Sequence, residues 1–318
     1  MAHHTFTPTA YHNTIGWQEP VAWVESGDTI TTTTVDARGF DIHWQPIAPR
    51  GNPMTGPFAV RGLEPGESLL VKILSLTPTR DRGFTTASVA PHCVDPDYVR
   101  ELPPNDLIYW QIDTDTRTVQ LIPPEGVTMP PLVVPLDPML GCFGVAPARS
   151  QFLSTATSGD YGGNMDYRRC RMGAAILFPV HAPGGRFFLG DGHAVQGDGE
   201  ISGNGVEVPM QVTFQLQRIA GVSIRWPRLI DAEGIATIGN ARPLDQATQH
   251  ATTEMLRCLI TEGGLVPAAA HLWLQQTVRY EVGNVFDPAY TMACQLPRAA
   301  WPDSLTDSQM IRAVLASQ

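Results

Sequence analysis

The chain has 318 residues, of which 43% are hydrophobic and only 16% are charged, and 31 acidic residues outnumber 21 basic ones. A formal net charge of -10 without a Lys/Arg-rich stretch excludes nucleic-acid binding through the phosphates. No apolar run reaches the length of a membrane span, and no basic segment followed by an apolar run opens the chain, so we expect a soluble protein without a membrane partner. Five widely spaced cysteines form no CxxC pair, which favours a reducing, cytoplasmic location.

The first half of the chain is predicted to form short strands separated by turns. β-branched residues dominate VAWVESGDTITTTTVDA from Val21, and SLLVKILSL from Ser68 continues this pattern. A hairpin is predicted over 109–121, turning at Thr114 and Asp115. Residues 77–106 follow no clear period, and loops of this length are often functional.

Helices are predicted only late in the chain. After Pro243, apolar residues recur at four-residue intervals until two glycines at 263–264 (Ala247, Ala251, Met255 and Leu259). A second helix is predicted over 266–278. A third is predicted over 306–317, opened by a capping box of Thr306 and Gln309.

These elements predict a mainly β fold with an α+β C-terminal part. We expect a β-rich N-terminal sub-domain over residues 1–125, resembling a sandwich or barrel. A second sub-domain over residues 126–318 would carry GGNMD and GDGHAVQGDGE, with a few late helices packed on a sheet.

One stretch, GDGHAVQGDGE from Gly190 to Glu200, concentrates acids and a histidine among glycines. It matches no dinucleotide fingerprint, phosphate loop or EF-hand, because Val195, Asp198 and Gln196 stand where those motifs need Gly, Lys and Gly. The chain has no G-x-S-x-G elbow, and its single lysine, Lys72, lies in an apolar strand-like stretch. Serine-elbow hydrolases and lysine-dependent amidases are therefore excluded.

Carboxylate and imidazole chemistry remains. In an extended segment, Asp191 and His193 point to one face, and Asp198 and Glu200 also share a face. An oxygen-rich cluster with one imidazole suits a divalent cation, and glycine N–H groups can hold an oxyanion. From spacing alone, two successive hairpin turns account for the acids equally well.

Between Gly144 and Glu207 the chain resembles the acetamidase/formamidase family. The resemblance rests on GVAPA, on STATSGDYGGNMD ending at Asp166, and on FPVHAPGGRFFLGDGHAVQGDGEISGNGVE; segments before residue 77 and VFDP at 285–288 are similar in order and spacing. It implies a cytoplasmic, homo-oligomeric enzyme that hydrolyses a short linear amide to a carboxylate and ammonia. It also implies a β-rich fold in which GGNMD and GDGHAVQGDGE meet in one pocket.

The matching positions have expected roles. Asp166, Asp191 and His193 are predicted to bind a divalent cation, zinc first, with calcium and magnesium as alternatives, which would activate a water. Glu200 is the predicted general base and acid, its pKa raised by the second catalytic candidate, Asp198. Glu207 is left open between a strand-end and a catalytic role. Backbone and amide groups predicted to hold the substrate belong to Gly163, Asn164, Gly192, Gln196 and Gly197.

Three departures from the family pattern concern the substrate. TRDRGFTTASVAPHCVDPD replaces a tryptophan-rich segment, Asn52 stands where the family usually has histidine, and Arg279 and Glu281 replace an acid and a base. Two alternatives therefore stay open: a non-catalytic small-molecule- or metal-binding protein on the same scaffold, and a relative acting on a larger or cyclic amide.

Overall fold

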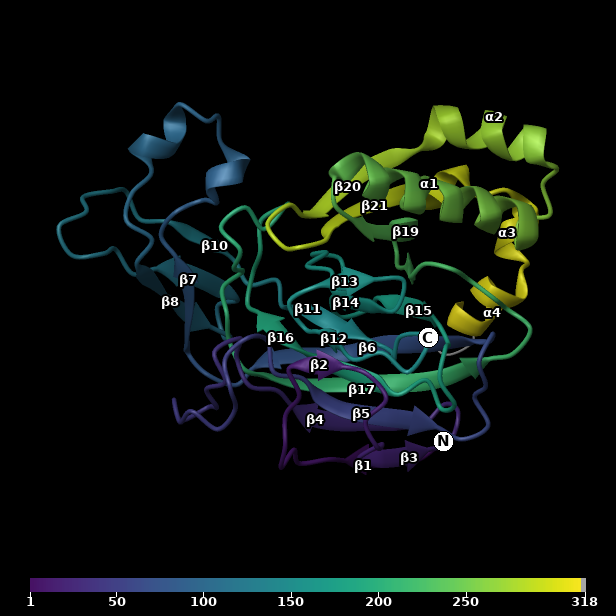
Figure 1. Cartoon of the computed structure of the whole chain (residues 1–318), viewed down its shortest axis with the longest axis horizontal. Coiled ribbons are helices and arrows are strands. Elements are labelled where there is room, and N and C mark those ends of the chain that lie inside the picture. The colour runs from purple at the N-terminus through teal and green to yellow at the C-terminus, as the bar shows by residue number, and fades with distance from the viewer. Residues whose placement is uncertain (316–318) are drawn as a thin grey trace.

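A nine-stranded sheet forms one layer of the protein, in a computed structural model that describes residues 1–315 (Figure 1). Every neighbouring pair in it is antiparallel except β1 and β4, which are parallel. In spatial order its strands are β1 (His3–Thr5), β4 (Thr29–Thr33), β17 (Met210–Ile219), β6 (Ser68–Pro78), β15 (Ala175–Pro179), β18 (Arg228–Ile230), β19 (Gly234–Ala241), β21 (Tyr290–Pro297) and β20 (Arg279–Asn284).

A six-stranded sheet packs against the large one and carries the glycine-rich motif. Its order is β13 (Ser158–Gly159), β14 (Gly162–Asn164), β11 (Met139–Gly144), β16 (Phe187–His193), β5 (Thr55–Val60) and β3 (Ala22–Val24). A two-stranded ladder joins β2 (Thr14–Ile15) to β12 (Leu153–Ser154). Because β11 and β16 are buried along their whole length, both faces of these strands belong to the interior.

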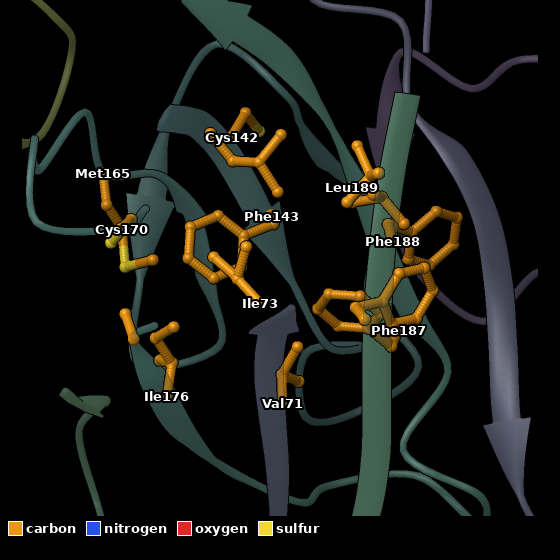
Figure 2. Close-up of a cluster of buried hydrophobic side chains, with 14 of the residues drawn as sticks. Val71, Ile73, Cys142, Phe143, Met165, Cys170, Ile176, Phe187, Phe188 and Leu189 are labelled. Atoms are coloured by element: carbon orange, nitrogen blue, oxygen red, sulfur yellow. The ribbon is translucent and has the colours of Figure 1, made fainter. Parts of the chain in front are cut away.

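The core between the two sheets is aromatic and aliphatic. Figure 2 shows Val71 and Ile73 of β6 close to the ring of Phe143 on β11, with Phe187 of β16 beside them. The Phe143 and Phe187 rings lie 6.4 Å apart in an edge arrangement that aromatic pairs prefer. Cys142 and Met165 belong to the same core, and they are the chain neighbours of Gly141 and Asp166.

Residues 77–135 build a smaller antiparallel sheet at one side of the molecule (Figure 1). Its strands are β7 (Arg82–Thr86), β8 (Leu107–Asp113), β9 (Thr118–Leu121) and β10 (Val133–Pro135), with the short helices η1 (Pro91–Cys93) and η2 (Tyr98–Glu101) between the first two. The predicted 109–121 hairpin is confirmed, since Asp113 pairs with Thr118 across the turn. The aperiodic 77–106 segment thus contains the end of β6, the strand β7 and two short helices.

Two long helices cover the β19, β21 and β20 end of the large sheet (Figure 1). They are α1 (Leu244–Thr261) and α2 (Pro267–Thr277), followed by η3 (Arg298–Ala300), α3 (Asp303–Thr306) and α4 (Gln309–Leu315). The four apolar residues that predicted α1 are all buried. A Cβ on Gly239 of β19 would lie 2.1 Å from the carbonyl oxygen of Ala247, so α1 packs directly on bare strand backbone. None of the helices in residues 1–315 is both long and apolar enough to cross a membrane.

The predicted capping box of the last helix is wrong. Thr306 is the final residue of α3, and the hydroxyl of Ser308 accepts the N–H of Ile311 at 3.3 Å in the first turn of α4. A short break between α3 and α4 thus moves the cap by two residues. Residues 316–317 of the predicted helix lie outside the described residues.

The mainly β fold with late helices on a sheet is confirmed. The large sheet takes β1, β4 and β6 from residues 1–125 and its remaining six strands from residues 126–318. Both predicted sub-domains therefore contribute to one sheet, and the division between them stays a prediction.

Candidate active site

A buried cluster of five acids and one histidine lies where four chain segments meet. Asp191 and His193 end β16, and Asp166 follows β14. Glu207 is brought to His193 by an isolated β-bridge, and a second bridge joins Gly199 to Asn284. The acids and the histidine are at most 8% exposed (Asp166, Asp191, His193, Glu200, Glu207 and Asp287).

Three of these acids have a left-handed backbone. The φ angles are 44° at Asp166, 56° at Asp191 and 45° at Glu200. Residues other than glycine adopt this conformation at a cost, and such residues concentrate at functional sites. Asp191 lies within a strand, between Gly190 and Gly192, which pair with Cys142 and Leu140 of β11.

Two glycines make room for the cluster. A Cβ on Gly141 would lie 2.3 Å from Asp166 Oδ1, 2.6 Å from Asp191 Oδ2 and 2.9 Å from His193 Cε1. A Cβ on Gly205 would lie 2.4 Å from the Cγ atom of the same imidazole. Any side chain at either position would therefore displace the acids or the ring.

The tautomer of His193 is set by Gln196. Gln196 donates its Nε2–H to the carbonyl oxygen of Asp166 at 2.6 Å, which turns its Oε1 toward His193 Nδ1 at 2.9 Å. His193 therefore carries a proton on Nδ1 and directs Nε2 into the acids. This is the arrangement in which a histidine presents Nε2 to a metal while the other nitrogen is held by a hydrogen bond.

The side-chain amide of Asn284 contacts one oxygen of each of three acids. Asn284 Nδ2 lies 2.8 Å from Asp166 Oδ2, 3.1 Å from Glu200 Oε2 and 2.7 Å from Asp287 Oδ2. Its Oδ1 accepts the N–H groups of Phe286 and Asp287, which fixes the direction of the amide. Three carboxylate oxygens thus gather around two N–H hydrogens, an arrangement that a shared proton or a bound cation would stabilise.

Other polar atoms in the cluster have no hydrogen-bond partner among the described residues. They are Asp166 Oδ1, Asp191 Oδ1, His193 Nε2 and Glu207 Oε2. His193 Nε2 lies 3.1 Å from Glu207 Oε1 and 3.5 Å from Asp191 Oδ1, without the orientation of a hydrogen bond. Leaving such groups buried and unpaired is costly, so the cluster fits a bound cation.

Three overlapping triads can hold a metal ion, each with ligand atoms within 4.8 Å of one another. Their members are Asp166, Asp191 and His193; His193, Glu200 and Glu207; and Asp166, Glu200 and Asp287. In residues 1–315, no arginine or lysine forms an ion pair with any of these acids. His193 is the cationic partner these acids can have within residues 1–315, and a bound cation would balance the negative charge that it leaves.

Burial dominates the ionisation of the site. It raises the pKa of Asp287 to about 6 and that of Glu207 to about 7, and it holds the pKa of Asp166 and Glu200 well above their usual range. Burial works against the charged imidazole of His193, but Glu207 and Asp191 outweigh it and raise the pKa of His193. Several of these groups therefore compete for protons near neutral pH.

The structure brings four of the predicted residues together and separates the fifth. Asp166, Asp191, His193 and Glu200 share the cluster. The side chain of Asp198 is 61% exposed and forms an ion pair with Arg168 on the surface. The expected shared face of Asp198 and Glu200 is wrong, because Gly199 and Glu200 both have positive φ and turn the chain. The acids that act with burial on the pKa of Glu200 are Asp287, Asp191 and Glu207.

The predicted substrate-binding residues have structural contacts of different kinds. Asn164 donates to Asp287 Oδ2 at 2.5 Å, and Gln196 orients His193. Gly192 packs on Met210, and Gly163 packs on the backbone of residues 157–158. Only Gly197 has open space beside it, since an added Cβ would meet nothing within 4 Å. Contact of these five residues with substrate stays a prediction.

Sequence reasoning missed the residues that complete the cluster from other segments. Asp287 and its partner Asn284 lie in VGNVFDP, and Gly141 and Gly205 are ordinary glycines in the sequence. The VFDP segment pointed to the site only through its resemblance to the acetamidase/formamidase family. Nothing local marked the two glycines, because their importance comes from what packs on them.

The protein is thus a β protein with two facing sheets and a buried acid–histidine cluster that can hold a metal ion. The acetamidase/formamidase family model matches residues 149–230, the region between β11 and β19 that includes Asp166, Asp191 and His193. A formamidase of Methylophilus methylotrophus is 26% identical over 194 residues, which are 47% of this chain and 47% of that protein. The match thus spans about half the length of this curated relative.

Solved structures match along nearly the whole chain. A predicted acetamidase/formamidase from Thermoanaerobacter tengcongensis superposes with a TM-score of 0.81 and 27% identity, over 98% of this chain and 99% of that one. The acetamidase of Yersinia enterocolitica superposes with a TM-score of 0.78 and 30% identity, over 94% of this chain and 92% of that one. The chain belongs to the acetamidase/formamidase family.

Proposed function

We propose that the protein hydrolyses the C–N bond of a short linear amide, of the size of formamide or acetamide, to a carboxylate and ammonia. The relatives named as formamidase and acetamidase support the reaction class. The single observation that carries the proposal is the set of four unpartnered buried atoms on Asp166, Asp191, His193 and Glu207. Such a set can hold a divalent cation, and a bound divalent cation can activate a water molecule.

Asp166, Asp191 and His193 are the proposed ligands of a divalent cation. Their donor set of two carboxylates and one imidazole favours zinc over calcium or magnesium, which prefer oxygen alone. A divalent cation held there would polarise the amide carbonyl and lower the pKa of water to about 7. The Nδ1–H contact of His193 with Gln196 keeps Nε2 available for this role.

Two glutamates are placed to move protons. Glu200 Oε1 lies 3.9 Å from His193 Nε2, and burial raises the Glu200 pKa well above its usual range, which makes its carboxylate a stronger base. In its carboxylate form Glu200 can take a proton from the attacking water, and the carboxylic acid formed can then give that proton to the departing nitrogen. Glu207, whose pKa burial raises to about 7, is a second candidate in reach of the same imidazole.

We also infer a homo-oligomer in the cytoplasm with a small amide as its partner. Apolar side chains exposed on and beside α2 support subunit contacts, since Val266 is 67% exposed and Leu272 is 66% exposed. Five free thiols support a reducing compartment.

Ammonia release tests the reaction. Protein dialysed with Zn²⁺ is incubated with formamide, acetamide and larger or cyclic amides, beside chelator-treated protein and an Asp191→Asn variant. We expect turnover of at least one short amide and its loss on chelation and in the variant. Turnover that survives chelation contradicts the proposed role of the metal. Absence of turnover with every amide contradicts the proposed enzymatic activity and favours the alternative of a non-catalytic binding protein.

A further inference from the structure

We propose that Asn52 is a positioning residue that directs the unpartnered Oδ1 of Asp191 toward the proposed cation. Through Asn164 it also orients Asp287. This inference rests on the proposed metal-dependent function. Asn52 lies in the loop between β4 and β5, far in sequence from both acids. It contributes none of the ligand atoms in the three triads of the cluster.

The loop holds Asn52 in a defined place. Its φ of 52° is left-handed, a conformation that asparagine tolerates better than most residues. The carbonyl oxygen of the preceding Gly51 accepts the Thr155 hydroxyl at 2.8 Å and Asn13 Nδ2 at 2.6 Å. The side chain of Asn52 is thereby directed at the cluster from a fixed backbone.

One amide nitrogen serves two acceptors with its two hydrogens. Asn52 Nδ2 donates to Asp191 Oδ2 at 3.0 Å and to Asn164 Oδ1 at 2.9 Å. The first contact occupies one oxygen of Asp191 and leaves Oδ1 without a partner among the described residues. The second fixes the amide of Asn164, so that its Nδ2 faces Asp287 Oδ2 at 2.5 Å.

Both sides of the cluster therefore depend on this one side chain. Without it, the Asp191 carboxylate is free to rotate about its Cβ–Cγ bond, and the amide of Asn164 is free to exchange its oxygen and nitrogen. Either change removes a cation-facing oxygen from its place. Loss of an outer hydrogen-bond partner of a metal ligand typically costs about 10- to 100-fold in metal affinity.

Zn²⁺ titration by calorimetry tests the inference on wild type, Asn52→Gly and Asn52→Ala. Glycine suits the left-handed backbone and so separates loss of the donor from loop strain. Asn105→Ala is the matched control, since the exposed Asn105 accepts the N–H of Ser88 at 3.0 Å and contacts neither the acids nor the Asn52 loop. We expect both Asn52 variants to bind Zn²⁺ about 10- to 100-fold more weakly than wild type, and Asn105→Ala to bind within about threefold.

Unchanged Zn²⁺ affinity in both Asn52 variants, or an equal loss in Asn105→Ala, overturns the positioning role. These results leave the proposed function intact if wild type binds Zn²⁺ and Asp191→Asn does not. Failure of wild type itself to bind Zn²⁺ overturns both proposals. Amide turnover at saturating Zn²⁺ adds a second readout, with kcat expected to fall in the Asn52 variants more than KM changes.

Discussion

Asp166 and Asp191 each have one oxygen held by an amide hydrogen and a second oxygen without a partner. A stability role alone does not explain this, because an unpaired buried polar atom costs about 1–3 kcal/mol. Both residues also have left-handed backbones, which add a further cost. These residues therefore lower the free energy of unfolding, and they hold a geometry that suits a bound cation.

Glu200 and Asp198 are two acids of the same motif with opposite environments. Glu200 is 6% exposed in the cluster, whereas the Asp198 side chain is 61% exposed. We expect Glu200→Gln to reduce amide turnover by about 100-fold or more, because glutamine cannot transfer the proton. Asp198→Asn is expected to stay within about twofold of wild type, since a surface ion pair contributes little. Initial rates of ammonia release measure both.

Retained Zn²⁺ binding in Glu200→Gln would assign the loss to proton transfer rather than to a missing ligand. An active Glu200→Gln protein, or an Asp198→Asn protein that loses turnover equally, would remove Glu200 from its proposed role.

Some of the site could be predicted from residues close in sequence. Asp191 and His193 alternate along one strand, and their place in a glycine-rich motif marked them without any structure. Glu207 and Asp287 reach the same imidazole region only because bridges join His193 to Glu207 and Gly199 to Asn284. Pairings between distant segments depend on the whole sheet arrangement, which local patterns do not encode.

At the scale of elements, regular patterns were reliable and irregular connections were not. The four-residue apolar repeat predicted α1, and the β-branched runs predicted strands such as β6. The capping box and the extended Asp198–Glu200 segment were wrong, because single turns at 199–200 and 306–308 override local preference. The prediction of a helix rests on a repeat over many residues, whereas the prediction of a helix end or a chain bend rests on a single turn.

Helix α1 also provides a test of the core through Cys258. Burial raises the pKa of its thiol from 9.0 to about 11. Between these pH values the unfolded chain loses the thiol proton while the folded protein keeps it, so the free energy of unfolding falls as pH rises. One thiol contributes a slope of up to about 1.4 kcal/mol per pH unit.

Urea unfolding at pH 8, 9, 10 and 11 measures this slope. We expect Cys258→Ala to lose less stability than wild type above pH 9, on top of a constant cost from the smaller side chain. Cys93→Ala is the control, because Cys93 is only partly buried and should change the slope less. Equal slopes in wild type and Cys258→Ala would show that burial of this thiol is not coupled to folding.

Across the whole molecule, the sheets are built from strands far apart in sequence. The nine-stranded sheet places β4, β17 and β6 side by side, and the six-stranded sheet places β11, β16 and β5 side by side. The fold class was predictable from composition and local pattern, but this strand order was not. Cys142 and Met165 of the shared core are the chain neighbours of Gly141 and Asp166, so the packing of both sheets helps to position the cluster.

The central claim, that this cluster holds a divalent cation, is tested most directly by metal content with Gly141→Ala. An added methyl group would lie among Asp166, Asp191 and His193, whereas Gly197→Ala adds a methyl group that meets nothing within 4 Å. Neither glycine has a positive φ among the described residues, so alanine fits both backbones. Mass spectrometry of protein dialysed with Zn²⁺ is predicted to find about one or more bound ions per chain in wild type and Gly197→Ala. Folded Gly141→Ala is predicted to hold far fewer; a wild type without metal, or an equally loaded Gly141→Ala, would contradict the claim.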